Sequence, residues 1–327
     1  MHLLKLVRPI NLLLIAVTMT LMRYFVLRPL VAVNGFELQL SLGQFAMLVI
    51  STILIGAAGN IINDYFDQEI DQVNKSSKRI VGVHISEKTA MTIYQILNIL
   101  GFALIFYLAY SLGKWKLSVV SFFAAASLWF YSVQFKKDLI IGNVLIAFLT
   151  GLIPLLVGIY EVPLLIDAYG KEVVEFFKAQ KPGEDPSLYF KWMFYFLAGY
   201  SGFAFLLNLA REIQKDMADV KGDSKQGART LPTVIGINNS KWVVNVLITI
   251  TIILLFTVQQ EVISDYYSLG YLIIAVLVPL VGSVWLSHKS LERQGFLKAS
   301  NLTKLAMFGG LMYSIAHYFI YYASDLS

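Results

Sequence analysis

The stretch NIINDYFDQEIDQVNK, residues 60–75, follows an apolar run long enough to cross a membrane, and its aspartates are spaced at i, i+3 and i+7: Asp64, Asp67 and Asp71. Much later in the chain, EIQKDMADVKGD, residues 212–223, repeats this spacing in Asp216, Asp219 and Asp223. At about 100° per residue, each triplet occupies roughly a 60° arc if its helix continues through it. The two stretches are therefore an internal repeat, and each is predicted to line one helical face.

The composition is that of a polytopic membrane protein. Of the 327 residues, 57% are hydrophobic and 14% are charged, and the mean hydropathy is +0.67. Apolar runs of about 18 to 22 residues recur, the length that crosses a hydrocarbon core of roughly 30 Å. They predict nine spans in one integral membrane domain, 1–327, over residues 9–27, 43–63, 90–112, 115–133, 139–160, 190–211, 241–258, 267–287 and 303–322.

Two residue types limit the possible chemistry. The sequence contains no cysteine, which excludes disulfides, thiolate metal sites and a cysteine nucleophile. Its four histidines are scattered, and no two have the close helical spacing of a zinc pair. A candidate site must therefore be built from carboxylates, amides and basic side chains.

Charge at the predicted connections sets the expected orientation. Lysines and arginines are concentrated in the connections that share a side with the amino terminus, which predicts that this side is cytoplasmic. The long motif loops, 64–89 and 212–240, fall on that side, and the carboxyl terminus falls outside. The outer loop 161–189 is expected to hold a short interfacial helix, because Val173, Val174 and Phe177 share a face. The net charge of +5 follows from this bias and indicates no nucleic-acid partner.

The acidic repeats are predicted to bind magnesium. Three like charges on one helical face repel each other, and an ionised acid costs about 2.5 to 3.5 kcal/mol at the centre of a membrane helix. Mg²⁺ offers compensation, because it takes oxygen ligands and bridges carboxylates to substrate phosphates. Solvated helix ends would explain one such cluster, but two clusters with the same spacing favour two Mg²⁺ ions and a shared diphosphate. The six aspartates are the candidate catalytic residues and metal ligands, with Asn60, Asn63 and Glu212 in support.

Other polar residues near the motifs are candidate substrate ligands. Cations that follow each motif can neutralise phosphate oxygens, and guanidinium groups can do so with two hydrogen bonds. A second group lies in WFYSVQFKK, between the fourth and fifth predicted spans, where Trp129 and Phe130 are expected in an aromatic belt. The candidate substrate-binding residues are Asn60, Asn63, Lys75, Arg79, Tyr131, Ser132, Lys137, Asn208, Glu212, Lys221 and Arg229.

These motifs together resemble the UbiA superfamily of intramembrane prenyltransferases. The resemblance covers nearly the whole chain and is carried by RPINLL at residues 8–13, the Asn-Asp-x-x-Asp-x-x-x-Asp pattern from Asn63 to Asp71, YS at residues 131–132 and the second acidic motif. It implies an all-α bundle around a central cavity that opens toward the membrane. It also implies that a Mg²⁺-bound prenyl diphosphate loses diphosphate and that a lipophilic acceptor captures the allylic cation.

The second motif also bears on the acceptor. REIQKDMADVKGDSKQGARTLP, residues 211–232, is most similar to the branch that transfers geranylgeranyl from its diphosphate to geranylgeranylglyceryl phosphate in membrane lipid biosynthesis. The first motif loop departs from the commoner family form, because Ile80 stands where a proline usually follows the arginine. The alternative within the family is an aromatic prenyltransferase of quinone biosynthesis, with para-hydroxybenzoate or dihydroxynaphthoate as acceptor.

Two other classes of membrane protein fit the sequence less well. A transporter would place acids near the bilayer midplane, whereas these cluster at one end of their spans. A phosphotransferase of the CDP-alcohol type would carry an Asp-Gly and Ala-Arg signature that is missing from this sequence. No protein partner is predicted, and the expected location is the cell membrane.

Overall fold

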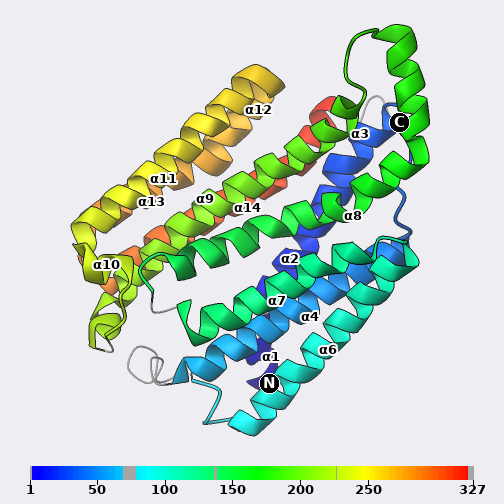
Figure 1. The fold of residues 1–327 in the computed structure, drawn as a ribbon. Helices are drawn as coiled ribbons and strands as arrows, with labels where there is room; N and C mark the ends of the chain where they lie inside the picture. The colour runs from blue at the N-terminus through cyan, green and yellow to red at the C-terminus, as the bar shows by residue number, and fades with distance from the viewer. Residues whose placement is uncertain (1, 69–78, 136–137, 226, 323–327) are drawn as a thin grey trace.

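The computed structural model describes residues 2–68, 79–135, 138–225 and 227–322, and helices make up nearly all of this part of the chain (Figure 1). The helices are α1 (His2–Val7), α2 (Pro9–Leu21), α3 (Arg28–Ala32), α4 (Leu42–Phe66), α6 (Glu87–Ser111), α7 (Ser118–Val133), α8 (Ile141–Gln180), α9 (Ser187–Lys225), α10 (Leu231–Val234), α11 (Gly236–Val258), α12 (Tyr266–Leu272), α13 (Val278–Lys289) and α14 (Arg293–Tyr321). Wider π-helical turns, Met22–Leu27 and Ile273–Leu277, join α2 to α3 and α12 to α13. The predicted all-α fold is confirmed.

The helices agree closely with the predicted spans. Within the described residues, eight helical segments are long and apolar enough to cross a membrane, and they coincide with the first eight predicted spans. The ninth, 303–322, lies within α14, which is 29 residues long but carries Arg293, Lys298 and Lys304 in its first half. This helix packs along α9 and α13, so it belongs to the same bundle.

Two predicted connections, 161–189 and 212–240, are wrong in extent, and the second is shorter because α9 continues through the second motif to Lys225. Helix α8 does not end at residue 160 but continues for 40 residues to Gln180, so no separate interfacial helix exists between 161 and 180. Pro154 and Pro163 lie inside α8, as membrane helices tolerate when neighbouring groups satisfy the freed carbonyls. Val173 and Phe177 are buried and belong to one cluster with Phe190 of α9, whereas Val174, predicted on the same face, is 37% exposed. The true connection is 181–186, where Pro182 and Gly183 interrupt the helix.

Six helices form a closed ring. Each of them packs against the next in the order α9, α8, α7, α4, α2 and α14, and α14 packs back against α9. Helix α6 covers α4 from outside, and α11 and α13 cover α9 and α14 (Figure 1). A ring closed in this way leaves its interior to the inward faces of these six helices.

Both acidic motifs lie at the same end of the ring. Helix α1 lies there too, because Asn60 Nδ2 near the end of α4 donates a hydrogen bond of 2.9 Å to the Val7 carbonyl oxygen. Helix α10, which follows α9, is also at this end, whereas α3 and α12 are at the other (Figure 1). The end that carries the motifs is called the acidic end below.

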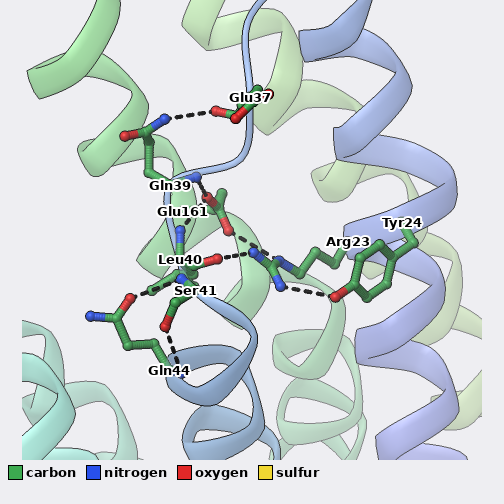
Figure 2. Close-up of polar contacts among 8 residues, drawn as sticks. All are labelled: Arg23, Tyr24, Glu37, Gln39, Leu40, Ser41, Gln44 and Glu161. Atoms are coloured by element: carbon green, nitrogen blue, oxygen red, sulfur yellow. Dashed lines mark hydrogen bonds and ion pairs between the residues drawn. The ribbon is translucent and has the colours of Figure 1, made fainter.

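The opposite end is held by a buried ion pair between α8 and the π-helical turn after α2 (Figure 2). Arg23 Nε lies 3.3 Å from Glu161 Oε2, and their side chains are 4% and 0% exposed. Glu161 also accepts the backbone N–H groups of Gln39 and Leu40, while Arg23 donates to the Leu40 carbonyl oxygen and to the Tyr24 hydroxyl. The pair therefore joins α2, α8 and the segment that leads into α4.

We expect Arg23→Leu to destabilise the protein by about 3 to 5 kcal/mol, because it leaves Glu161 buried without its counter-charge. The matched control is Asp167→Asn, which breaks the 2.7 Å pair with Lys114, where the Asp167 side chain is 58% exposed. The free energy of unfolding of Asp167→Asn should fall by less than about 1 kcal/mol. Unfolding of both variants in the same detergent micelles measures the difference, and equal losses would contradict a structural role for the buried pair.

Candidate active site

The ring of helices lines most of a cavity of about 1160 Å³, which also reaches residues of α11 such as Thr251 and Leu255. Its polar lining comes from both motif helices, and eight of the predicted site residues belong to it: Asn60, Asn63, Asp67, Tyr131, Asn208, Glu212, Asp216 and Asp219. Farther along α9 the lining becomes aromatic, with Tyr195, Phe196, Tyr200 and Phe203. The two motifs, which lie far apart in sequence, thus meet at the acidic end of one cavity.

The wall on α4 is formed by Asn60, Asn63 and Asp67. Asn63 Nδ2 donates a hydrogen bond of 2.8 Å to Asp67 Oδ2, and Asp67 is only 5% exposed. Asp64 does not line the cavity. It pairs with Arg8, which does line it. Asp64 lies on α4, which ends at Phe66, and Asp67 is the C-cap of this helix.

The wall on α9 is formed by Asn208, Glu212, Asp216 and Asp219, all on one uninterrupted helix. Asn143 Nδ2 of α8 donates a 2.7 Å hydrogen bond to Asp216 Oδ2, and Asn208 Nδ2 donates to Thr150 Oγ1 at 3.1 Å. Arg293 at the start of α14 lies 3.0 Å from Asp219 Oδ1. Asn208, Asp216 and Asp219 are therefore each oriented by a neighbouring helix, whereas Glu212 pairs with Arg211 and Lys215 of α9 itself.

Tyr131 shows that the two walls face each other. This tyrosine of α7 is close enough to interact electrostatically with Asp67 on one wall and with Glu212 and Asp216 on the other. Arg8 interacts with the same tyrosine and also with Lys215 of α9. The acidic end therefore brings α2, α4, α7 and α9 together around a small polar volume.

Several predicted site residues lie away from the cavity. Ser132 Oγ donates to the Leu128 carbonyl oxygen of its own helix at 2.9 Å, and Arg79 Nε donates to the Val81 carbonyl oxygen at 3.2 Å. Asp223 accepts from Thr230 Oγ1 at 3.4 Å, and the side chains of Lys221 and Arg229 are exposed. Asp71, Lys75 and Lys137 lie outside the described residues.

The structure adds site residues that the sequence reasoning missed. Arg8, Arg211, Lys215 and Lys304 line the cavity, and Asn143 and Arg293 hold acids that do. Arg8 and Arg211 open two of the stretches that carry the family resemblance. Their position next to these motifs could have indicated a role in the site. Asn143 and Lys304 carry no such signal, because only tertiary packing brings α8 and α14 to the motifs.

The donor set fits magnesium. Carboxylate and amide oxygens are hard ligands of the kind Mg²⁺ takes, and Mg²⁺ usually binds one or two carboxylates together with waters and substrate phosphates. In the described part of the chain, no three acidic or histidine side chains lie close enough to hold a metal ion by themselves. Acids on facing walls with open space between them suit a metal that shares its ligands with a bound diphosphate.

The fold and the site define a membrane-embedded enzyme that works on a phosphorylated lipid in an intramembrane cavity. Residues 30–307 match the UbiA prenyltransferase family, and the chain belongs to that family. It is 30% identical over 266 residues to digeranylgeranylglyceryl phosphate synthase of Thermococcus kodakarensis, covering 80% of this chain and 82% of the relative.

Solved structures show the same fold. A digeranylgeranylglyceryl phosphate synthase superposes with a TM-score of 0.63 at 22% identity, covering 96% of this chain and 98% of that one. A UbiA homolog of Archaeoglobus fulgidus, bound to DMAPP and Mg²⁺, superposes with a TM-score of 0.54 at 17% identity, covering 97% of this chain and 99% of that one.

We expect Asn143→Ala to lower prenyl transfer about tenfold or more and to raise the Mg²⁺ concentration needed for half-maximal rate, because Asp216 loses the donor that orients it. The matched control is Asn239→Ala, since Asn239 Nδ2 only donates to Ile235 of its own helix at 2.8 Å. Initial rates across a Mg²⁺ titration measure the effect. An unchanged titration curve for Asn143→Ala would contradict this role.

Proposed function

We propose that this protein transfers a geranylgeranyl group from geranylgeranyl diphosphate to geranylgeranylglyceryl phosphate within the membrane. The observation that carries the proposal is the meeting of both acidic motifs at one end of a single, largely apolar cavity. The relatives named for this synthase agree with it, and so does the A. fulgidus homolog that binds DMAPP, a prenyl diphosphate, with Mg²⁺. Prenyl transfer is the activity of the family, whereas the chain length of the donor and the identity of the acceptor are what we propose.

The cavity provides separate environments for the two parts of the donor. On α9 the lining runs from Trp192 to Asp219, which spans roughly 40 Å at 1.5 Å per residue. The diphosphate belongs at the acidic end, and the isoprenoid chain belongs along the aromatic and aliphatic lining, where it is removed from water. Ionisation in such a dry site avoids loss of the cation to water.

In the reaction, the C1–O bond of the donor breaks and its electron pair leaves with the diphosphate. A hydroxyl oxygen of the acceptor then bonds to C1 of the allylic cation and gives up its proton to the released diphosphate. Asn63 and Asp67 on one wall, and Glu212, Asp216 and Asp219 on the other, would hold Mg²⁺. The bound metal supplies positive charge to the departing diphosphate. Arg8 and Lys215 add fixed positive charge at the same end.

Tyr131 is the aromatic residue best placed to stabilise the cation. It lines the cavity between the two acidic walls, where the C1 atom of the donor must lie if its diphosphate is held there. The face of an aromatic ring attracts a cation, and more strongly when water is excluded. The tyrosines and phenylalanines farther along α9 are suited instead to contact with the chain.

We propose the same orientation that the sequence predicts, with the acidic end and the amino terminus in the cytoplasm. At the acidic end, the described connections and helix starts carry Arg79, Lys88, Arg229 and Lys298, in keeping with the excess of cations on cytoplasmic loops. Both phosphorylated substrates would then approach from the cytoplasmic leaflet.

The direct test of this proposal uses Asp67→Ala and Asp216→Ala. Each should abolish transfer from geranylgeranyl diphosphate while the protein still inserts and purifies, because each removes a proposed metal ligand from one wall. Chelation of Mg²⁺ should do the same to the wild type, and added Mg²⁺ should restore the rate. Glu175→Ala, an exposed acid on α8, is the control. Full turnover by either aspartate variant would rule out the assigned site.

Product mass identifies the acceptor. Wild-type protein is incubated with Mg²⁺, labelled geranylgeranyl diphosphate and either geranylgeranylglyceryl phosphate or an aromatic acid. A prenylated glyceryl phosphate supports the proposal, and a prenylated aromatic acid in its place would refute the choice of acceptor.

We expect Gly199→Leu to impair long donors more than short ones. Gly199 lines the cavity, and an added Cβ at this position meets open space, so a leucine side chain would occupy room needed by the chain. Gly202→Leu is the matched control, because Gly202 lies on the same helix with equally open surroundings but is exposed and outside the lining. The ratio of kcat/KM for geranylgeranyl to geranyl diphosphate should fall only in Gly199→Leu. A ratio equal in both variants would argue against chain binding along α9.

A further inference from the structure

Two cations of the cavity, Arg211 on α9 and Lys304 on α14, lie close together without a role in the mechanism above. Thr303 Oγ1 donates a 2.9 Å hydrogen bond to Gln214 Oε1, which fixes the register of the two helices at this level. Both cations line the cavity, and they are close enough to repel each other electrostatically.

The acids beside these cations do not neutralise them. The only acid paired with Arg211 in the described part of the chain is Glu212, whose Oε1 lies 3.0 Å from Arg211 Nη1 and is shared with Lys215 Nζ at 2.7 Å. Arg211 Nε is buried and lacks a hydrogen-bond partner among the described residues. Lys304 forms no ion pair within them. A buried donor and two repelling charges in a largely apolar cavity are costly unless an anion binds there.

Arg211 pairs with Glu212, one of the proposed metal ligands, but Asp216 lies on another side of α9. Around α9, Arg211 is about 140° from Asp216 at 100° per residue. Asp216 is held from the α8 side by Asn143, whereas Lys304 reaches the cavity from α14. An anion at Arg211 and Lys304 would therefore lie beside the metal-bound diphosphate and not in its place.

The surroundings of Lys304 suit a lipid that enters from the bilayer. Leu305 and Phe308, on the same face of α14, line the cavity and are 52% and 44% exposed. Across from them on α2, Ile10 also lines the cavity and is 68% exposed. Apolar side chains that belong to both the cavity and the outer surface mark an opening toward lipid, and Lys304 lies one residue from its edge.

We propose that Arg211 and Lys304 form a second anion subsite, which binds the phosphomonoester of the acceptor lipid. This inference rests on the proposed function and adds to it the position of the acceptor headgroup. A guanidinium and an ammonium together can contact several oxygens of a phosphomonoester through charge-assisted hydrogen bonds. The subsite would hold the acceptor by its phosphate so that its hydroxyl faces the acidic end.

Lys304→Gln tests the subsite. Its apparent KM for geranylgeranylglyceryl phosphate should rise about tenfold or more, while its KM for geranylgeranyl diphosphate changes less than about threefold, because only one of the two ligands loses a charged contact. Lys304→Arg, which keeps the cation, should retain most of the affinity. Lys298→Gln, an exposed lysine on the same helix and outside the cavity lining, should behave as the wild type.

A second readout compares the acceptor with its dephosphorylated form, geranylgeranylglycerol. The wild type should prefer the phosphorylated acceptor, and Lys304→Gln should lose most of this preference, because its kcat/KM falls far more for the phosphorylated acceptor than for the neutral one. Retained rates with the neutral acceptor also show that the variant is folded.

The outcomes separate the two proposals. If the wild type transfers to the phosphorylated acceptor and Lys304→Gln keeps the wild-type preference, the subsite is refuted and the proposed function stands. A rise in KM for the diphosphate donor alone would assign the cations to the donor and refute the subsite. If the wild type prenylates only aromatic acids, the proposed function fails and the inference fails with it.

Discussion

The structure depends on holding carboxylates at the edge of an apolar interior. An ionised acid in such surroundings is stable only if it is paired or hydrogen-bonded. Asp67 is bonded by Asn63, Asp216 by Asn143 of α8, and Asp219 by Arg293 of α14. The contacts of Asp216 and Asp219 form only if α8 and α14 both pack against α9 at the acidic end. The packing of the ring and the arrangement of the polar site therefore depend on each other.

Buried charges are stabilised in different ways at the two ends of the bundle. At the far end, Arg23 and Glu161 are almost fully buried, and each makes further hydrogen bonds with the chain around it. At the acidic end the charges line a cavity and leave room for a ligand. The first arrangement satisfies its charges internally, whereas the second leaves room to bind a diphosphate with its metal and, as we propose, the acceptor phosphate.

The sequence predicted what local periodicity determines. Span length predicted the membrane helices, and the repeated spacing of aspartates pointed to the ends of α4 and α9, where Asp67, Asp216 and Asp219 line the cavity. It did not predict that α8 continues to Gln180 or that Asp67 caps α4, because neighbouring helices decide where a membrane helix ends. Asn143 and Arg293 were missed for a related reason, since their partners lie 73 and 74 residues away and no spacing rule connects them.

The position of the cavity relative to the aspartates has a physical explanation. On α4, Asn60 and Asn63 line the cavity about two turns and one turn before Asp67, and on α9 Asn208 similarly precedes the acids. A neutral amide costs less to bury than an ionised carboxylate. The deeper positions therefore carry asparagine, which can still offer an oxygen or N–H to a ligand, and aromatic residues follow beyond Asn208. This gradient from acid to amide to aromatic matches an amphiphile whose charged head and apolar chain enter one cavity.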